Sequence, residues 1–161
     1  MREARPDEHA EAGRVTAEAY REFVRPGETP WEEYLQEVAD VAGRAQRTTV
    51  LVAVEGARIL GSASLELEGR IEEGQDGPLP PGEAHIRMLG VAQDARGRGV
   101  ARAIMSACEG LARRRGRRRI TLNTTRRMHA AQAMYPALGY ERGPDRTFDD
   151  GFVLLSYSKR L

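Results

Sequence analysis

Hydrophobic and polar positions recur along this chain with two different periods, which predicts a mixture of helices and strands. Segments 7–24 and 29–45 carry apolar residues at helical spacing, with Asp7 and Thr29 where N-caps belong. Segment 48–54 is a nearly continuous, largely β-branched apolar run, which is typical of a buried central strand. Strands are also expected over five further segments: 2–6, 58–68, 83–91, 118–125 and 152–158.

Two more helices are expected in the second half of the chain. Segment 99–115 has an apolar stripe at helical spacing, and segment 129–140 is a short helical pattern ended by glycine. Segment 69–82 is rich in glycine, proline and charge, which indicates a loop rather than a linker between domains. The 161 residues are therefore expected to form one domain over 1–161.

A glycine-rich corner joins the strand over 83–91 to the helix over 99–115. Arg96, Gly97 and Gly99 stand where that helix begins. The first N–H groups of a helix lack intrahelical partners, and glycine lets a ligand come close to them. The corner therefore predicts a site for a phosphate-bearing ligand such as a nucleotide cofactor. The alternative is a tight turn with a purely structural role.

Two common phosphate-binding loops do not fit this corner. A P-loop requires Gly-Lys-Ser/Thr, whereas Val100, Ala101 and Arg102 follow Gly99. The dinucleotide fingerprint G-x-G-x-x-G requires a third glycine where Arg102 stands. The pattern that remains is R-G-x-G-x-A, preceded by a strand that ends in Leu-x-Val.

This remaining pattern resembles the acyl-CoA-binding signature of the GNAT superfamily of N-acetyltransferases. Arg96, Gly99 and Ala101 fall on its defining positions. A second segment is similar to the family's A-x-x-x-Y-x-x-x-G-F/Y pattern. Four residues of this chain fall in register with it: Ala131, Tyr135, Gly139 and Tyr140. Both signatures occur in the family's order.

The resemblance implies an α/β (α+β) fold, a single GNAT-like domain with a mixed central sheet of about six to seven strands flanked by about four helices. It also implies an N-acetyltransferase in which a primary amine directly attacks acetyl-CoA, the acyl-donor cosubstrate. The cofactor-binding residues that it implies are Leu89, Gly90, Val91, Arg96, Gly97, Arg98, Gly99, Val100, Ala101, Arg102, Ala131 and Tyr135.

Tyr135 falls on the family tyrosine that lies beside the CoA sulfur and acts as a general acid. The alternative is a core aromatic residue on one face of its helix. Two departures from the family pattern bear on this assignment. Pro136 follows directly, so we expect the helix to kink or end early. Met128 stands where the family has an asparagine.

The same resemblance places a proton-accepting glutamate on the strand over 83–91. The nearest counterpart is His85, with Glu83 on the same strand face. His85 has the ordinary pKa closest to neutrality, so it is the candidate base and Glu83 its supporting carboxylate. Alternatively, both line an open groove. Gly90 is the expected position of a bulge that frees N–H groups for the acyl carbonyl, or else a gap in packing.

Composition narrows the chemistry further. Cys108 is the only cysteine, so an intramolecular disulfide and a cysteine-based metal cluster are excluded, and no metal is expected. It lies in the apolar stripe of the helix over 99–115, which favours a core thiol over a nucleophile. No apolar run is long enough for a membrane span and no signal peptide is visible, so we expect a cytoplasmic protein.

The net charge of +1 indicates neither a nucleic-acid nor a membrane partner. The arginine cluster over 113–119 nevertheless has three interpretations: a nucleic-acid patch, a helix C-terminus, or phosphate steering. We favour the helix end, with Gly116 as its stop, because no aromatic residues interleave the arginines.

The expected partner is a small-molecule or peptide amine, and the sequence leaves open whether the protein forms a homodimer. Six acidic loop residues suggest a groove for a cationic amine: Glu32, Glu33, Asp76, Asp145, Asp149 and Asp150. The alternative function is a non-catalytic acyl-CoA-binding sensor or partner module of the same fold, which Pro136 and Met128 would suit.

Overall fold

A mixed β-sheet runs through the computed structural model, which describes residues 1–25, 29–70, 77–149 and 151–161. The strands follow one another in this spatial order: β1 (Arg2–Glu3), β2 (Thr49–Glu55), β3 (Arg58–Glu66), β4 (Glu83–Val91), β5 (Arg119–Thr125), β8 (Val153–Arg160) and β6 (Glu141–Arg142). A further strand, β7 (Arg146–Thr147), also pairs with β8. Only the β4–β5 pair is parallel among the described strands.

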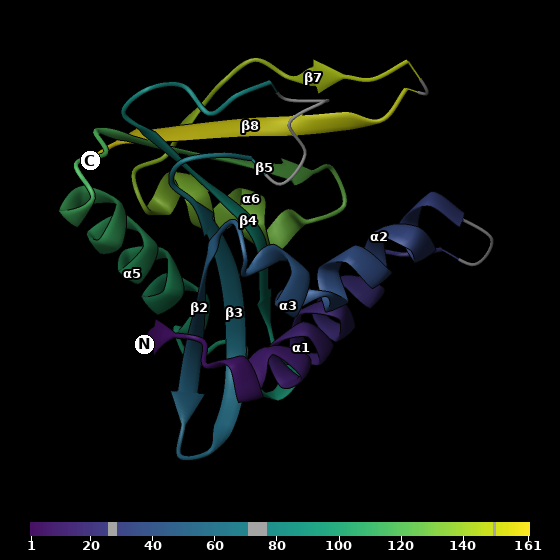
Figure 1. Cartoon of the computed structure of the whole chain (residues 1–161). Coiled ribbons are helices and arrows are strands. Elements are labelled where there is room, and N and C mark those ends of the chain that lie inside the picture. The colour runs from purple at the N-terminus through teal and green to yellow at the C-terminus, as the bar shows by residue number, and fades with distance from the viewer. Residues whose placement is uncertain (26–28, 71–76, 150) are drawn as a thin grey trace.

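Helices cover both faces of this sheet (Figure 1). Helices α1 (His9–Arg21), α2 (Thr29–Ala39) and α3 (Val41–Arg44) lie together on one side. Helices α5 (Val100–Arg114) and α6 (His129–Ala137) pack on the opposite face around the larger hydrophobic core. The α/β fold predicted from the sequence is confirmed.

The start of the chain differs in detail from the sequence prediction. A 3-10 turn, η1 (Pro6–Glu8), precedes α1, so Asp7 is not the N-cap. Glu8 organises this turn instead, because its carboxylate accepts the Arg5 backbone N–H at 2.9 Å. The same carboxylate binds the Arg2 guanidinium at 2.6 Å, which ties β1 to the beginning of α1.

The single helix predicted over 29–45 is broken into α2 and α3. Asp40 adopts a non-helical conformation between them, and its carboxylate accepts the Gly43 N–H at 2.8 Å as the cap of α3. An aspartate side chain competes with the helix for backbone N–H groups, which explains the break. Close packing accompanies it: a Cβ placed on Gly13 of α1 would lie 2.0 Å from the Ala39 carbonyl oxygen.

Two further predictions about helix ends have opposite outcomes. The early end expected at Pro136 is wrong, since α6 continues to Ala137 and the Leu138 N–H still reaches the Met134 carbonyl at 3.1 Å. Pro136 has no N–H, so it removes the single bond to the Gln132 carbonyl, while the N–H groups that follow it can still donate. The helix-end interpretation of the arginine cluster is confirmed, because Gly116 has a φ of 71° just beyond α5.

Strands β6 and β7 were not expected from the sequence. Each has two residues and forms only by pairing with β8. Segments this short carry no detectable period. Among the described residues, no helix is long and apolar enough to cross a membrane.

Two helical glycines differ in the space around them, which predicts opposite effects of adding a methyl group. Gly13→Ala should destabilise the protein by about 1–3 kcal/mol, because the new Cβ collides with the α2 backbone. Gly110→Ala in α5 should stabilise it by about 0.5–1 kcal/mol, because the Cβ there meets only the flexible end of Arg114. Urea unfolding of both variants checks this, and equal effects would contradict the packing argument.

Candidate functional site

Strands β4 and β5 separate halfway along their length. Their parallel pairing begins at Glu83–Arg119 and ends at Ile86–Leu122. Beyond that point β4 continues beside β3, while Asn123 and the rest of β5 stay paired with β8. The two strands therefore diverge, and beyond this point the backbone groups on their facing edges no longer pair with the other strand.

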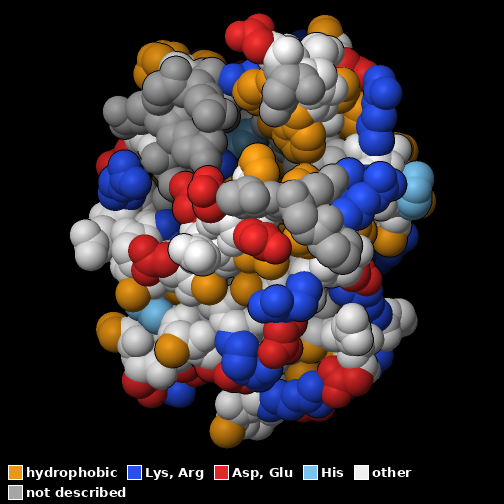
Figure 2. All heavy atoms as spheres, turned by 90° about the vertical axis from the view of Figure 1, so that its right-hand side faces the viewer, with side chains coloured by type: hydrophobic (Ala, Val, Ile, Leu, Met, Phe, Trp, Pro, Cys, Tyr) orange, Lys and Arg blue, Asp and Glu red, His pale blue; other side chains and the backbone are white. Residues whose placement is uncertain are grey.

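A cavity of about 930 Å³ occupies this divergence. The β4 segment Leu89–Val91 lines one wall and Leu122 with Asn123 the other. Tyr20 of α1 lines it from one face of the sheet, whereas α5 and α6 line it from the opposite face. The cavity thus passes between the strands. Figure 2 shows a hollow with hydrophobic side chains along an edge, on a face where acidic and basic side chains are mixed.

The irregularity of β4 lies at Met88, not at Gly90. Ser62 of β3 pairs with Gly90 and Ser64 pairs with Arg87, so β4 holds one extra residue between these pairs. Met88 has a φ of 53° and is the only non-glycine among the described residues with positive φ. The bulge predicted at Gly90 is therefore wrong by two positions, although it lies on the predicted strand.

Gly90 has a packing role. A Cβ at this position would lie 3.0 Å from both Cα and Cγ2 of Thr16 in α1. The absence of a side chain at Gly90 lets α1 approach β4 closely. Gly90 therefore marks a close contact between β4 and α1. The gap in packing, which was the alternative from the sequence, is not found there.

The glycine corner has the geometry that its sequence predicts. Gly97 and Gly99 both have positive φ, at 73° and 81°, and a Cβ on either would meet nothing within 4 Å. The first intrahelical bond of α5 runs from Ala103 N–H to the Gly99 carbonyl at 3.0 Å. The N–H groups of the three preceding residues, 100–102, are therefore unused inside the helix, beside open space. This arrangement fits the phosphates of acetyl-CoA.

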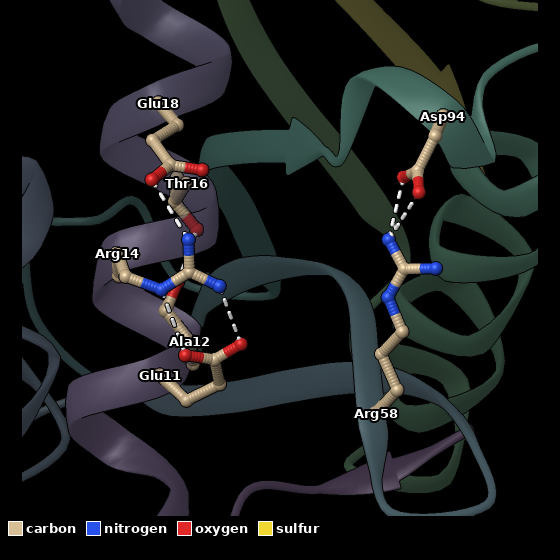
Figure 3. A network of polar contacts seen from close by, with 7 residues as sticks. All are labelled: Glu11, Ala12, Arg14, Thr16, Glu18, Arg58 and Asp94. Atoms are coloured by element: carbon tan, nitrogen blue, oxygen red, sulfur yellow. Dashed lines mark hydrogen bonds and ion pairs between the residues drawn. The ribbon is translucent and has the colours of Figure 1, made fainter.

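The arginines of this corner have different partners. Arg96 lines the cavity and its Nη1 binds Glu22 Oε2 of the α1 C-terminus at 2.9 Å. Arg98, predicted to bind the cofactor, pairs with Glu55 instead and does not line the cavity. Glu55 ends β2, so Arg98 contacts the β2–β3 hairpin. Asp94 contacts the same hairpin through its ion pair with Arg58, the first residue of β3 (Figure 3). These pairs fasten the hairpin to the corner.

Eleven of the twelve predicted cofactor-binding residues line the cavity: Leu89, Gly90, Val91, Arg96, Gly97, Gly99, Val100, Ala101, Arg102, Ala131 and Tyr135. Met128, in the position of the family asparagine, also lines it, and its Sδ accepts a hydrogen bond from Thr124 Oγ1 at 3.4 Å. The two sequence signatures thus meet across the divergence of β4 and β5.

Tyr135 belongs to both the core and the cavity. Its side chain is buried, and its ring lies 5.3 Å from that of Tyr157 and 6.0 Å from that of Tyr140. Burial raises the pKa of Tyr135, so its hydroxyl stays protonated at neutral pH. A protonated hydroxyl at the cavity wall is able to donate a proton.

The structure does not bring His85 or Glu83 to the cavity. His85 is 4% exposed, and its Nδ1 lies 2.7 Å from Thr121 Oγ1 in the paired half of β4 and β5. Burial lowers the pKa of His85 to about 3, with Arg70 and Arg87 adding to the effect. Glu83 faces Arg119 at 3.3 Å. The prediction of His85 as a base at neutral pH is therefore wrong.

The predicted acidic groove does not line the cavity either. Glu32 and Glu33 are exposed on α2, Asp145 pairs with Arg142, and Asp149 is exposed, and none of the four reaches the lining. The remaining two, Asp76 and Asp150, lie outside the described residues. The position of an acidic residue in a loop segment therefore does not predict whether its side chain faces the cavity.

Two charged lining residues were not predicted from the sequence: Arg87 and Arg127. Arg87 carried a usable signal, since it is a charged residue inside an otherwise largely apolar strand. Cys108 is fully buried, and burial raises its pKa to about 12, in agreement with its predicted place in the core. Among the described residues, no cluster of three or more metal-ligating side chains occurs.

Comparisons with known proteins agree with this fold. The chain aligns over 99% of its length with a ribosomal-protein-alanine N-acetyltransferase from Brucella melitensis (21% identity, 98% of that chain, TM-score 0.69). It aligns over 99% with yncA from Salmonella typhimurium, solved with its cofactor acetyl-CoA (18% identity, 92% of that chain, TM-score 0.69). A GNAT-family acetyltransferase from Staphylococcus aureus gives a TM-score of 0.74 at 11% identity, covering 99% of this chain and 97% of that one.

No curated protein sequence matches the chain significantly. The profile of the Acetyltransferase (GNAT) family, however, matches residues 15–140, which include the diverging strands, the glycine corner and Tyr135. The chain therefore belongs to the GNAT acetyltransferase family.

Proposed function

We propose that this protein transfers an acetyl group from acetyl-CoA to a primary amine by direct attack of the amine. The observation that carries the proposal is the divergence of β4 from β5, with one cavity reaching from the glycine corner to Tyr135. Titration with acetyl-CoA, followed by measurement of CoA release with a panel of amines, tests both halves of the proposal.

The glycine corner binds the phosphates of the cofactor. Unused N–H groups over 100–102 supply hydrogen-bond donors, the N-terminus of α5 supplies a favourable dipole, and Arg96 and Arg102 supply charge. The exposed edge of Leu89–Val91 holds the extended arm in the manner of an added strand, because β5 no longer occupies it.

Acetyl-CoA supplies the acetyl group as a thioester, whose sulfur departs as the thiol. Tyr135 lines the cavity with a protonated hydroxyl, so we assign it as the donor of the proton that the departing sulfur takes. The tyrosinate then regains a proton from water. Cys108 takes no part, because it is fully buried and its thiol is kept protonated. The acetyl group therefore passes directly from the sulfur of CoA to the amine nitrogen, without an intermediate on the protein.

The proton of the incoming amine leaves to water. Among the described lining residues, the one carboxylate is that of Glu22, which is bound to Arg96. His85 is neutral and enclosed. The acceptor therefore reacts as the free amine, and its free fraction sets how the rate rises with pH.

The sensor hypothesis loses its main support. It rested on Pro136 and Met128, yet α6 continues through Pro136 and Tyr135 still lines the cavity. We also infer one N-acetyltransferase domain over 1–161, supported by β1 and β8 from the two ends of the chain joining the same sheet. The cytoplasmic location, the homodimer and the absence of a nucleic-acid partner stay predictions.

Gly99→Val should abolish measurable acetyl-CoA binding by isothermal titration. A side chain there fills the space beside the unused N–H groups and strains a backbone with φ of 81°. Gly56→Val is the matched control, because Gly56 also has positive φ and open space but does not line the cavity. The control should lose stability and keep affinity; retained affinity in Gly99→Val would refute the phosphate assignment.

Tyr135→Phe should lower kcat by about 100-fold or more while changing the Kd for acetyl-CoA by less than about threefold. The ring and its packing are kept, and only the proton donor is removed. Tyr157→Phe, in the same aromatic cluster but outside the lining, is the control and should retain activity. Equal rates for the two variants would assign Tyr135 to the core alone.

His85→Gln should leave the pH–rate profile unchanged and flatten the pH dependence of stability. The folded state holds the His85 pKa at about 3, below its ordinary value of 6.5, so it favours the neutral ring. The stabilisation is complete above about pH 6.5 and is lost as pH falls toward 3, by about 2–3 kcal/mol at pH 4.5. Urea unfolding at several pH values measures this. A changed rate profile in the variant would restore His85 as a base.

A further inference from the structure

Among the described residues that line the cavity, the charged side chains are mostly arginines. Among its described lining residues are four arginines and one carboxylate, Glu22, which is already bound to Arg96 at 2.9 Å. Arg96 and Arg102 belong to the glycine corner. Arg87 and Arg127 line the cavity away from the corner, together with Tyr20 and Phe23. Cationic acceptors would meet like charge there.

Arg87 lies in a wall, formed by β3 and β4, behind which a second arginine is buried. It faces Ser64 across the β3–β4 pair, and Ser64 Oγ also accepts a hydrogen bond from Arg44 Nε at 2.9 Å. Arg44 is 4% exposed, and its Nη1 donates to the Glu37 carbonyl at 2.8 Å. A buried guanidinium therefore stands behind the cavity wall. The nearby buried carboxylate, Glu66, lies opposite His85 and is not part of the lining.

Arg87 also lies close enough to act on the pKa of two neighbouring groups. Burial raises the pKa of Tyr20, and the charges of Arg87 and Arg44 oppose that rise. Arg87 also contributes, after burial, to the lowered pKa of His85. The field of Arg87 thus reaches groups on α1 and on the neighbouring half of β4.

Arg127 approaches from the opposite arm of the divergence, between β5 and α6. Its Nη1 donates to the Phe23 carbonyl at 2.8 Å, and its guanidinium lies 5.9 Å from the centre of the Trp31 ring. These contacts fix the orientation of a planar group with five N–H donors. A fixed guanidinium is well suited to a carboxylate.

Aromatic side chains continue from this arginine as one row. The Tyr20 and Tyr34 rings are 6.1 Å apart, those of Tyr34 and Trp31 5.9 Å, and those of Trp31 and Phe152 6.2 Å. The row joins α1, α2 and the start of β8. Its inner end, Tyr20, lines the cavity, which gives an apolar or aromatic body a surface to pack on.

We propose that the acceptor is an amine that also carries a carboxylate, with an apolar or aromatic body, as in an amino acid. The inference rests on the proposed acetyl transfer. The carboxylate binds between Arg87 and Arg127, which directs the amine toward Tyr135. This replaces the cationic acceptor expected from the acidic loops, whose described members do not line the cavity.

The test compares amines that differ in charge and little else. CoA release is measured with phenylalanine, methionine and glycine, each beside its carboxamide, and with spermidine, at rates corrected for the free-amine fraction. We expect kcat/KM to be at least about tenfold higher for an amino acid than for its carboxamide, carried by KM. Phenylalanine and methionine should exceed glycine, and spermidine should be poorest.

Arg87→Gln and Arg127→Gln should each reduce the preference for the carboxylate toward one. Arg14→Gln is the matched control, because Arg14 lies on the exposed face of α1, paired with Glu11 and Glu18 (Figure 3). Its preference should equal that of the unaltered protein. If either cavity variant fails to fold, the comparison of acids and carboxamides in the unaltered protein still decides.

The outcomes separate this inference from the proposed function. Equal or better rates with carboxamides or spermidine would overturn the carboxylate-bearing acceptor while leaving acetyl transfer intact. A preference that survives in both arginine variants would also overturn it. If no amine releases CoA, the inference is refuted, and acetyl-CoA titration then shows whether the cofactor site fails as well.

Discussion

The end of the parallel pairing between β4 and β5 at Ile86–Leu122 is the constraint on which the rest of the site depends. Parallel strands that stayed paired would satisfy each other's N–H and C=O groups and leave no room for an extended ligand. Each strand here keeps a partner on its outer edge, so the sheet survives the separation. The extra residue at Met88 bends β4 where the pairing ends, and its side chain remains buried beneath α1 and α2.

Contacts from neighbouring elements hold the divergence open in a defined shape. Gly90 lets α1 lie directly against β4, and Glu22 at the end of α1 meets Arg96 of the glycine corner. On the other arm, Arg127 is bonded to the Phe23 carbonyl. The C-terminus of α1 therefore contacts both arms of the divergence. A site built on such contacts is arranged before any ligand arrives, which lowers the cost of ordering it on binding.

Burial keeps three groups uncharged over a wider range of pH than they would have in water. It keeps His85 neutral, and it keeps the hydroxyl of Tyr135 and the thiol of Cys108 protonated. Arginine is the group that keeps its charge under these conditions, because its pKa is far above neutrality. The positive charge of the described lining therefore comes from four arginines, of which Arg87 and Arg127 lie away from the glycine corner, and the neutral groups contribute shape.

The sequence alone was enough to determine β4, the corner at Gly99 and the helix that carries Tyr135. Each of these depends on a local pattern that acts within a few residues: strand alternation, a glycine at positive φ, or helical spacing. Alternation also placed Glu83 and His85 on one strand face. It does not predict that His85 lies enclosed against Thr121, or that Arg87 lines the cavity. Burial and charge pairing are properties of residues that folding brings together from distant parts of the chain, so only the tertiary structure decided them.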